Sequence, residues 1–216
     1  MAHIHLEDGS FSLVWVLIWW IIALACIGAA LWALRSTGNK NQKQITIAAF
    51  ITAAAFAVFQ INIPLFGGVH LNLTPLIAIL AGPVLGTLVV LVINILSAAI
   101  GHGGWGLVGA NVLVNLSEVV VAYIIFRGIR GFIPDLFSRA GIATFAGLFC
   151  GNLVMVAIIL VSGIQGVTQS STQVLAGLTL IMAVNMGVAV IEAIITGLIV
   201  RYIGKIRPDI LGENHP

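Results

Sequence analysis

Long apolar stretches with almost no charge constrain this chain more than any other feature. Of its 216 residues, 60% are hydrophobic and 7% are charged, whereas a soluble globular domain carries roughly 25% charged residues. An apolar run of about 18 or more residues is typical of a helix that crosses a lipid bilayer. The composition therefore predicts an all-α, polytopic protein of the cell membrane.

The chain is expected to form a single transmembrane domain, because no hydrophilic block is long enough to fold alone. We divide residues 1–216 into an external N-terminal segment (1–10), a helical bundle (11–200) and a basic cytoplasmic tail (201–216). The apolar runs of the bundle cover residues 11–34, 44–63, 76–100, 106–126, 142–161 and 174–200.

The positive charges predict the orientation of these runs. The nine Lys and Arg residues fall into three clusters, and positive clusters are typical of cytoplasmic loops. The N-terminus is then outside and the C-terminus is inside. The residues are Arg35, Lys40 and Lys43, then Arg127, Arg130 and Arg139, then Arg201, Lys205 and Arg207.

This orientation requires the run 76–100 to enter the membrane and to return. The run has 25 residues, whereas two full spans need roughly 40. We expect a short helix that turns at Gly82-Pro83 and a longer helix that returns, an arrangement that lines buried substrate sites. The predicted total is about seven transmembrane helices.

Four of the five histidines gather on the predicted outer face, and imidazole is the commonest side-chain ligand of transition metals. A free α-amine, backbone amides and the nearby His3 imidazole can also hold Ni(II) or Cu(II) in a plane. Each histidine has a simpler interpretation as part of an unstructured terminus, a loop or a turn. The outer four are His3, His5, His70 and His102, and His215 lies in the tail.

The number of ligand atoms that the N-terminus supplies depends on whether Met1 is removed. Without Met1, the Ala2 amine with the His3 amide and imidazole supplies three ligands, and His70 is a candidate for the fourth. With Met1 retained, its amine, two amides and the His3 imidazole already make four.

Two carboxylates lie within apolar runs, where charge is costly and usually functional or paired. They are Glu118 and Glu192, and no Lys or Arg within the runs can neutralise them. The simpler interpretation is a buried hydrogen bond to another helix through Asn115, Asn152 or Asn185. No enzyme signature accompanies them, and a net charge of +2 gives no reason to expect a nucleic acid partner.

Short motifs follow one another in order along nearly the whole chain: His3-Ile4-His5-Leu6-Glu7-Asp8-Gly9, the loop histidine His70, Ala78-Ile79-Leu80-Ala81-Gly82-Pro83, His102-Gly103-Gly104, Gly109-Ala110-Asn111, Glu192-Ala193-Ile194-Ile195-Thr196 and Lys205-Ile206-Arg207-Pro208-Asp209. Each motif is weak alone. Together, their order and spacing resemble the CbiM/NikM family, the substrate-capturing membrane subunits of energy-coupling-factor transporters for cobalt and nickel.

The resemblance implies a metal site and a set of partners. Ni²⁺ or Co²⁺ is then the transported substrate, with no prosthetic group, and supply of cobalamin biosynthesis is one use of the ion. Implied partners are a transmembrane coupling subunit, two cytoplasmic ATPase subunits and a small accessory membrane subunit. The implied ligands are the Met1 or Ala2 amine, His3 and His70, with His5, His102 and Asn111 as further candidates.

The resemblance also identifies a helix face and three departures from the family, one of which is that the loop after His70 lacks the usual Thr-Gly run. Ala49, Ala53 and Ala57 repeat every four residues, like the small-residue face that binds the coupling subunit. Ala2 separates Met1 from His3, where the family has His directly after Met, and Asn185 stands where the family often has His.

Two other functions remain open from the sequence. The first is a subunit of the same fold that captures an organic micronutrient such as a vitamin, because fold does not determine substrate. The second is an intramembrane zinc enzyme, which needs a carboxylate beside the outer histidines. The apolar runs place Glu118 and Glu192 too deep for that role.

Overall fold

The computed structural model describes residues 4, 6, 8–36, 42–59, 62–63, 69–101, 103–166 and 170–211. In these residues the chain is built almost entirely from α-helices: α1 (Leu13–Ser36), α2 (Gln42–Phe59), α3 (Thr74–Ala99), α4 (Val108–Gly128), α5 (Leu136–Ser162) and α6 (Ser171–Ile206). Two short strands, β1 (Asn62–Ile63) and β2 (Val69–His70), pair antiparallel between α2 and α3. Single 3₁₀ turns are η1 (Trp105–Leu107), η2 (Ile129–Gly131) and η3 (Pro208–Ile210).

Five of the helices are long and apolar enough to cross a membrane: α1, α3, α4 with its flanking turns, α5 and α6. The apolar part of α2, Ile45–Phe59, is shorter. The prediction of an all-α, multi-pass membrane protein is therefore confirmed. The total of seven crossings and the outer N-terminus stay predictions.

Helix α3 is broken at Gly82, whose backbone has φ 77° and ψ 173°. Ile77 and Gly86 are nine residues apart, which corresponds to about 13.5 Å along a continuous helix. A Cβ atom built on Gly86 would nevertheless lie only 3.7 Å from Ile77 Cγ2. The segments 74–81 and 83–99 therefore fold back on one another. The turn expected at Gly82-Pro83 is present.

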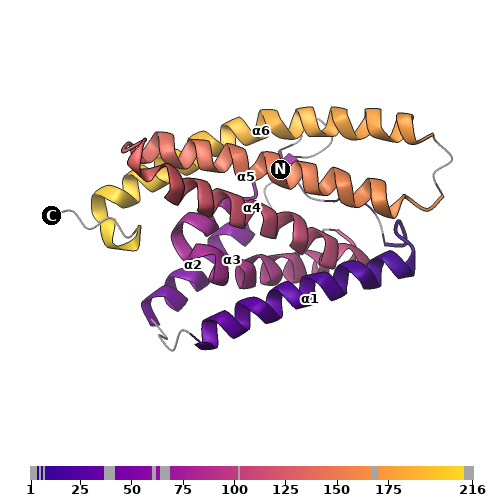
Figure 1. The fold of residues 1–216 in the computed structure, drawn as a ribbon, viewed down its shortest axis with the longest axis horizontal. Helices are drawn as coiled ribbons and strands as arrows, with labels where there is room; N and C mark the ends of the chain where they lie inside the picture. Colours follow the sequence, from indigo (N-terminus) through magenta and orange to yellow (C-terminus); the bar gives the residue numbers. More distant parts are fainter. Residues whose placement is uncertain are drawn as a thin grey trace.

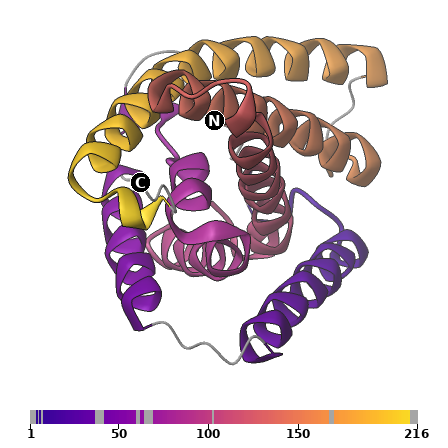
Figure 2. The same cartoon turned by 60° about the vertical axis from the view of Figure 1, so that its left-hand side comes forward.

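The helices surround the first segment of α3. Helix α4 packs against α1, α3 and α5, and α5 packs against α6, while α2 packs against α3. Helices α1 and α6 lie on opposite sides of the bundle (Figure 1). Every residue from Thr74 to Ile79 is buried, and this part of α3 lies inside the ring of helices in Figure 2.

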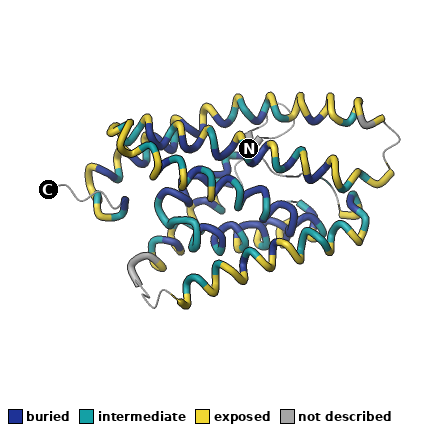
Figure 3. Tube along the Cα trace, viewed as in Figure 1, coloured by how far each residue is buried: buried dark blue, intermediate teal, exposed yellow. Residues whose placement is uncertain are grey.

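The outer surface of the bundle is apolar. On α1, only Ala23 and Ile27 are buried, and large side chains such as Leu13, Ile21 and Trp32 are exposed (Figure 3). Exposed apolar side chains around a bundle are compatible with a lipid environment, in which they need no cover.

Several helix ends differ from the expected runs. Helix α5 begins at Leu136 because the Asp135 carboxylate caps it by accepting the Ser138 N–H. Arg139, expected in a cytoplasmic connector, therefore lies inside α5, where it is 1% exposed and its guanidinium lies 4.4 Å from the Phe126 ring centroid. A cation over an aromatic face is attracted by the ring, which makes this burial tolerable.

The second and the last runs also end elsewhere. Helix α2 ends at Phe59, so that Ile63, expected at the end of that helix, belongs to β1. Helix α6 continues to Ile206, and Arg201 and Lys205 of the expected tail therefore form its last turns.

Candidate functional site

The N-terminal segment is bound to the start of α4 through its backbone. Asn111 Oδ1 accepts the Ile4 N–H at 2.8 Å, and Asn111 Nδ2 donates to the Ile4 carbonyl at 3.3 Å. Ile4 itself is 1% exposed. One buried amide side chain therefore satisfies both backbone groups of the residue that follows His3 in the chain.

Two further contacts hold the next residues of this segment. The Asp8 carboxylate accepts the Gly106 N–H at 2.8 Å and the Trp105 N–H at 3.1 Å, both at the start of η1. The Ser10 carbonyl accepts the Gln165 N–H at 2.8 Å. The segment is thus fastened to the α3–α4 and α5–α6 connections before α1 begins.

His70 lies in β2, opposite Asn62 of β1. It is 3% exposed, and its ring centroid lies 5.6 Å from that of Phe59 at the end of α2. His70, expected in a loop, is thus a buried residue of a short strand. The short strand pair places this imidazole inside the protein.

Asn72, two residues beyond His70, is the centre of a buried polar cluster. Its N–H donates to Glu192 Oε2 on α6, and its Nδ2 donates to Glu118 Oε2 and Asn115 Oδ1 on α4, each at 3.1 Å. Asn72 is 2% exposed, and both glutamates are 0% exposed. The two carboxylates expected deep in the bundle are therefore the groups that bind the His70 loop.

Helix α4 brings the two segments together. Asn111, Asn115 and Glu118 recur at the spacing of one helical face, so that Asn111 and Asn115 lie on successive turns about 6 Å apart along the axis. One turn holds Ile4 and the next holds Asn72. The N-terminal segment and the His70 loop, far apart in sequence, therefore dock side by side on α4.

The other predicted asparagine contacts form a separate pair. Asn185 Nδ2 on α6 donates to Asn152 Oδ1 on α5 at 2.8 Å. Of the three asparagines expected to meet the glutamates, Asn115 reaches Glu118 through Asn72, whereas Asn152 and Asn185 bind each other.

Most of the predicted metal ligands lie outside the described residues: Met1, Ala2, His3, His5 and His102. Within the described part of the chain, no three His, Cys, Asp or Glu side chains gather where they could hold a metal ion. Sequence reasoning gave no anchoring role to Asn72 or to Asp8. Asn72 is a polar residue between two leucines, a pattern that indicates a buried hydrogen-bonding role only once the loop is known to be internal.

The alanine stripe of α2 faces outward. Ala49, Ala53 and Ala57 are exposed, whereas Ala48 and Ala55 on the other side of the helix are buried. This face presents small side chains to whatever surrounds the bundle.

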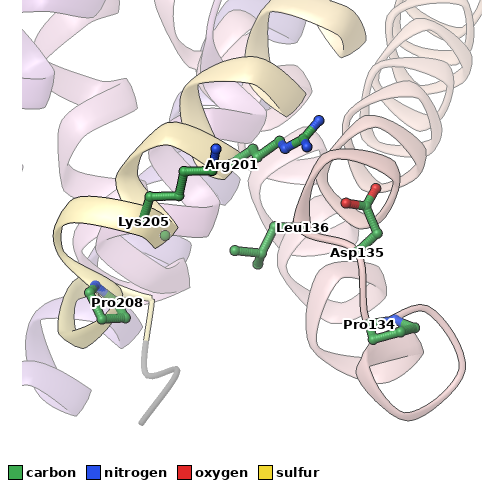
Figure 4. A pocket seen from close by; sticks show the side chains of 7 residues that line it. Pro134, Asp135, Leu136, Arg201, Lys205 and Pro208 are labelled. Atoms are coloured by element: carbon green, nitrogen blue, oxygen red, sulfur yellow. The ribbon is translucent and has the colours of Figure 1, made fainter. Parts of the chain in front are cut away.

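A cavity of about 380 Å³ lies at the other end of the bundle, between the start of α5 and the end of α6 (Figure 4). Its charged lining consists of Asp135, Arg201 and Lys205. Hydrogen bonds from the Ser138 backbone and hydroxyl hold the pKa of Asp135 below its usual range, with a smaller contribution from Arg201. A single carboxylate beside two cations does not suit a divalent metal.

Comparison with known proteins relates this arrangement to one family. Residues 5–210 match the model of CbiM, described as the cobalt uptake substrate-specific transmembrane region. A relative in Methanocorpusculum labreanum, named as cobalt transport protein CbiM 1, is 28% identical over 96% of this chain and 91% of its own length. A fused nickel transport protein, NikMN, of Archaeoglobus fulgidus is 29% identical over 97% of this chain and 68% of its own length.

A solved structure shares the fold. The crystal structure of a transition metal transporter superposes with a TM-score of 0.80, at 19% identity, over 97% of this chain and 96% of that one.

Proposed function

Because this chain belongs to the CbiM family of cobalt-uptake transmembrane proteins, we propose that it captures Ni²⁺ or Co²⁺ at the outer face of the cell membrane for import. The chain is a multi-pass membrane protein of a transport family and not an enzyme. One observation carries the proposal: successive turns of α4 hold the residue after His3 and the loop of His70.

The proposed ligands are nitrogen atoms from these two segments. The Ala2 or Met1 amine, the His3 amide and imidazole, and the His70 imidazole make a set that suits planar coordination of Ni(II), and Co(II) accepts the same donors. The burial of His70 supports this role, because an enclosed imidazole is shielded from competing water. Backbone capture by Asn111 supports it as well, because a chelate made of main-chain atoms requires a fixed main chain.

The further candidates differ in what they can contribute. Both polar atoms of the Asn111 amide bind the Ile4 backbone, so we assign Asn111 to positioning rather than to ligation. His5 and His102 remain candidates for additional ligands.

We propose that transport requires other chains. The described residues contain five candidate membrane helices and no nucleotide-binding domain, so the energy source is expected on two cytoplasmic ATPase subunits. A transmembrane coupling subunit would bind the exposed face of Ala49, Ala53 and Ala57, where small side chains allow close helix contact. A small accessory membrane subunit completes the proposed energy-coupling-factor importer, and cobalamin biosynthesis is a proposed use of imported cobalt.

Metal analysis of the purified protein with its native N-terminus tests the proposal. We expect bound nickel or cobalt, and we expect an uncleaved extension before Met1 to abolish binding, because an amide nitrogen replaces the free amine. Mass measurement shows whether Met1 is present. Unchanged Ni²⁺ affinity of the extended protein would disprove the N-terminal chelate, and an organic molecule bound without metal would favour a vitamin-type substrate.

A further inference from the structure

We infer that Asn72 is the positioning residue that fixes His70, by fastening its loop to α4 and α6 at the same time. The hydrogen bonds that define this role are those to Glu118, Asn115 and Glu192. The inference rests on the proposed function only in taking His70 as a ligand of the captured ion.

The first argument is the number of anchors on one small residue. Both hydrogens of the Asn72 amide and its backbone N–H are donated to oxygen atoms of fully or almost fully buried side chains. A hydrogen bond is stronger away from water, and breaking one of these bonds would leave a buried polar group without its partner. These three bonds therefore restrain the loop relative to both α4 and α6.

The second argument is backbone strain directly after Asn72. Leu73 has φ 51° and ψ 15°, which makes it the one residue other than glycine with positive φ in the described part of the chain. A buried leucine in this left-handed conformation persists only when its surroundings over-determine it. The Asn72 anchors on one side and the start of α3 at Thr74-Pro75 on the other supply that constraint.

The third argument is the short path from Asn72 to the imidazole. His70 is two residues away and belongs to a strand pair only two residues long, which alone is a weak restraint. Without the Asn72 bonds, Leu73 can relax, and the position of His70 changes with it. Partners that orient a metal ligand in this way typically contribute 10–100-fold to metal affinity.

The experiment compares Asn72→Leu with Asn152→Ala in the full chain with its native N-terminus. Asn72→Leu keeps the number and branching of the side-chain heavy atoms and removes the side-chain amide that donates to Glu118 and Asn115. Asn152→Ala is the matched control, because it removes a fully buried amide that binds Asn185 between α5 and α6. The measurements are Ni²⁺ affinity, midpoint of thermal unfolding, and hydrogen exchange of backbone amides in residues 69–74 without metal.

We expect Asn72→Leu to weaken Ni²⁺ binding by about 10–100-fold and to speed exchange in residues 69–74. Asn152→Ala should change neither quantity to that extent, even where both variants lose similar thermal stability. Asn115→Ala removes one of the three acceptors. Its effects on Ni²⁺ affinity and on exchange in residues 69–74 should be intermediate between those of the other two variants.

Two outcomes would overturn the inference: unchanged exchange in residues 69–74 of Asn72→Leu, or equal Ni²⁺ affinity in Asn72→Leu and the unsubstituted protein. Failure of the proposed function looks different. In that case the unsubstituted protein binds no Ni²⁺, while exchange in residues 69–74 still responds to Asn72→Leu and not to Asn152→Ala.

Discussion

Gly151 of α5 lies directly against the Glu118 side chain of α4. A Cβ atom at position 151 would come within 2.5 Å of both Glu118 Cγ and Glu118 Oε1. One turn earlier, a Cβ atom on Gly147 would lie 2.9 Å from the Glu118 carbonyl oxygen. The two glycines allow α5 to approach α4 closely enough to enclose this carboxylate.

We therefore expect Gly151→Ala to destabilise the protein by about 1–3 kcal/mol, the usual cost of overpacking a core. The added methyl group displaces Glu118 and disturbs its bond to Asn72. Gly177→Ala on exposed α6 is the control, because a Cβ atom there meets nothing within 4 Å. Thermal unfolding in detergent measures both, and equal midpoints for the two variants would contradict the packing argument.

Asn111→Ala should weaken capture of the ion. The substitution removes both hydrogen bonds to the Ile4 backbone, and the freed N-terminal segment no longer holds the proposed chelate in place. A loss of about 10–100-fold in Ni²⁺ affinity is expected for a residue that orients ligands.

Asn94→Ala is the control for this experiment. Asn94 is also buried, but its amide donates to the Val90 carbonyl of its own helix. Equal Ni²⁺ affinity in Asn111→Ala and Asn94→Ala would show that the segment needs no such fastening.

Ala53→Leu should prevent assembly with a coupling subunit while leaving capture of the ion intact. Ala53 is exposed in the middle of the small-residue stripe, and a leucine there keeps a partner helix at a distance. We expect co-purification with the coupling and ATPase subunits to fall by about tenfold or more, equivalent to roughly 1.4 kcal/mol. Ala29→Leu, at an exposed alanine of α1, should assemble normally, and an intact Ala53→Leu complex would exclude this face as the interface.

The cap of α5 should make stability depend on pH. Because hydrogen bonds from Ser138 lower the pKa of Asp135 in the folded protein, the ionised cap stabilises the fold above the unfolded-state pKa of about 3.9. This contribution is lost as the pH falls through the lowered folded-state value. The difference in thermal midpoint between the unsubstituted protein and Asp135→Ala should therefore be full at pH 7 and shrink in acid.

Asp135→Asn provides the comparison. Asparagine also caps helices but does not titrate, so the difference between Asp135→Asn and Asp135→Ala should stay constant with pH. A constant difference between Asp135 itself and Asp135→Ala would refute the pH dependence.

Much of the fold was predictable because membrane helices are determined by local composition. The apolar runs predicted the helices, since a lipid-exposed backbone must satisfy its own hydrogen bonds. The shortness of the run 76–100 predicted the turn at Gly82-Pro83. Helix ends were less predictable, because Asp135 and the Phe126 ring allow α5 to begin earlier and to bury Arg139.

The candidate site was predictable only as a collection of residue types. The sequence singles out His70, Glu118 and Glu192, but periodicity places the glutamates in the apolar runs and the histidine outside them. It does not reveal that Asn72 bonds to both glutamates, because a hydrogen bond between residues 120 positions apart depends on helix packing.

The sequence by itself determined that this chain crosses a membrane, roughly which stretches form its helices, and which residues have the chemistry to bind a transition metal. Those properties follow from local composition and side-chain type. Only the tertiary structure decided that the start of the chain and the His70 loop meet on α4, because that meeting depends on Asn111, Asn115 and Glu118 facing inward together. In the structure, the buried Glu118 and Glu192 side chains hold the loop of His70 through their hydrogen bonds to Asn72.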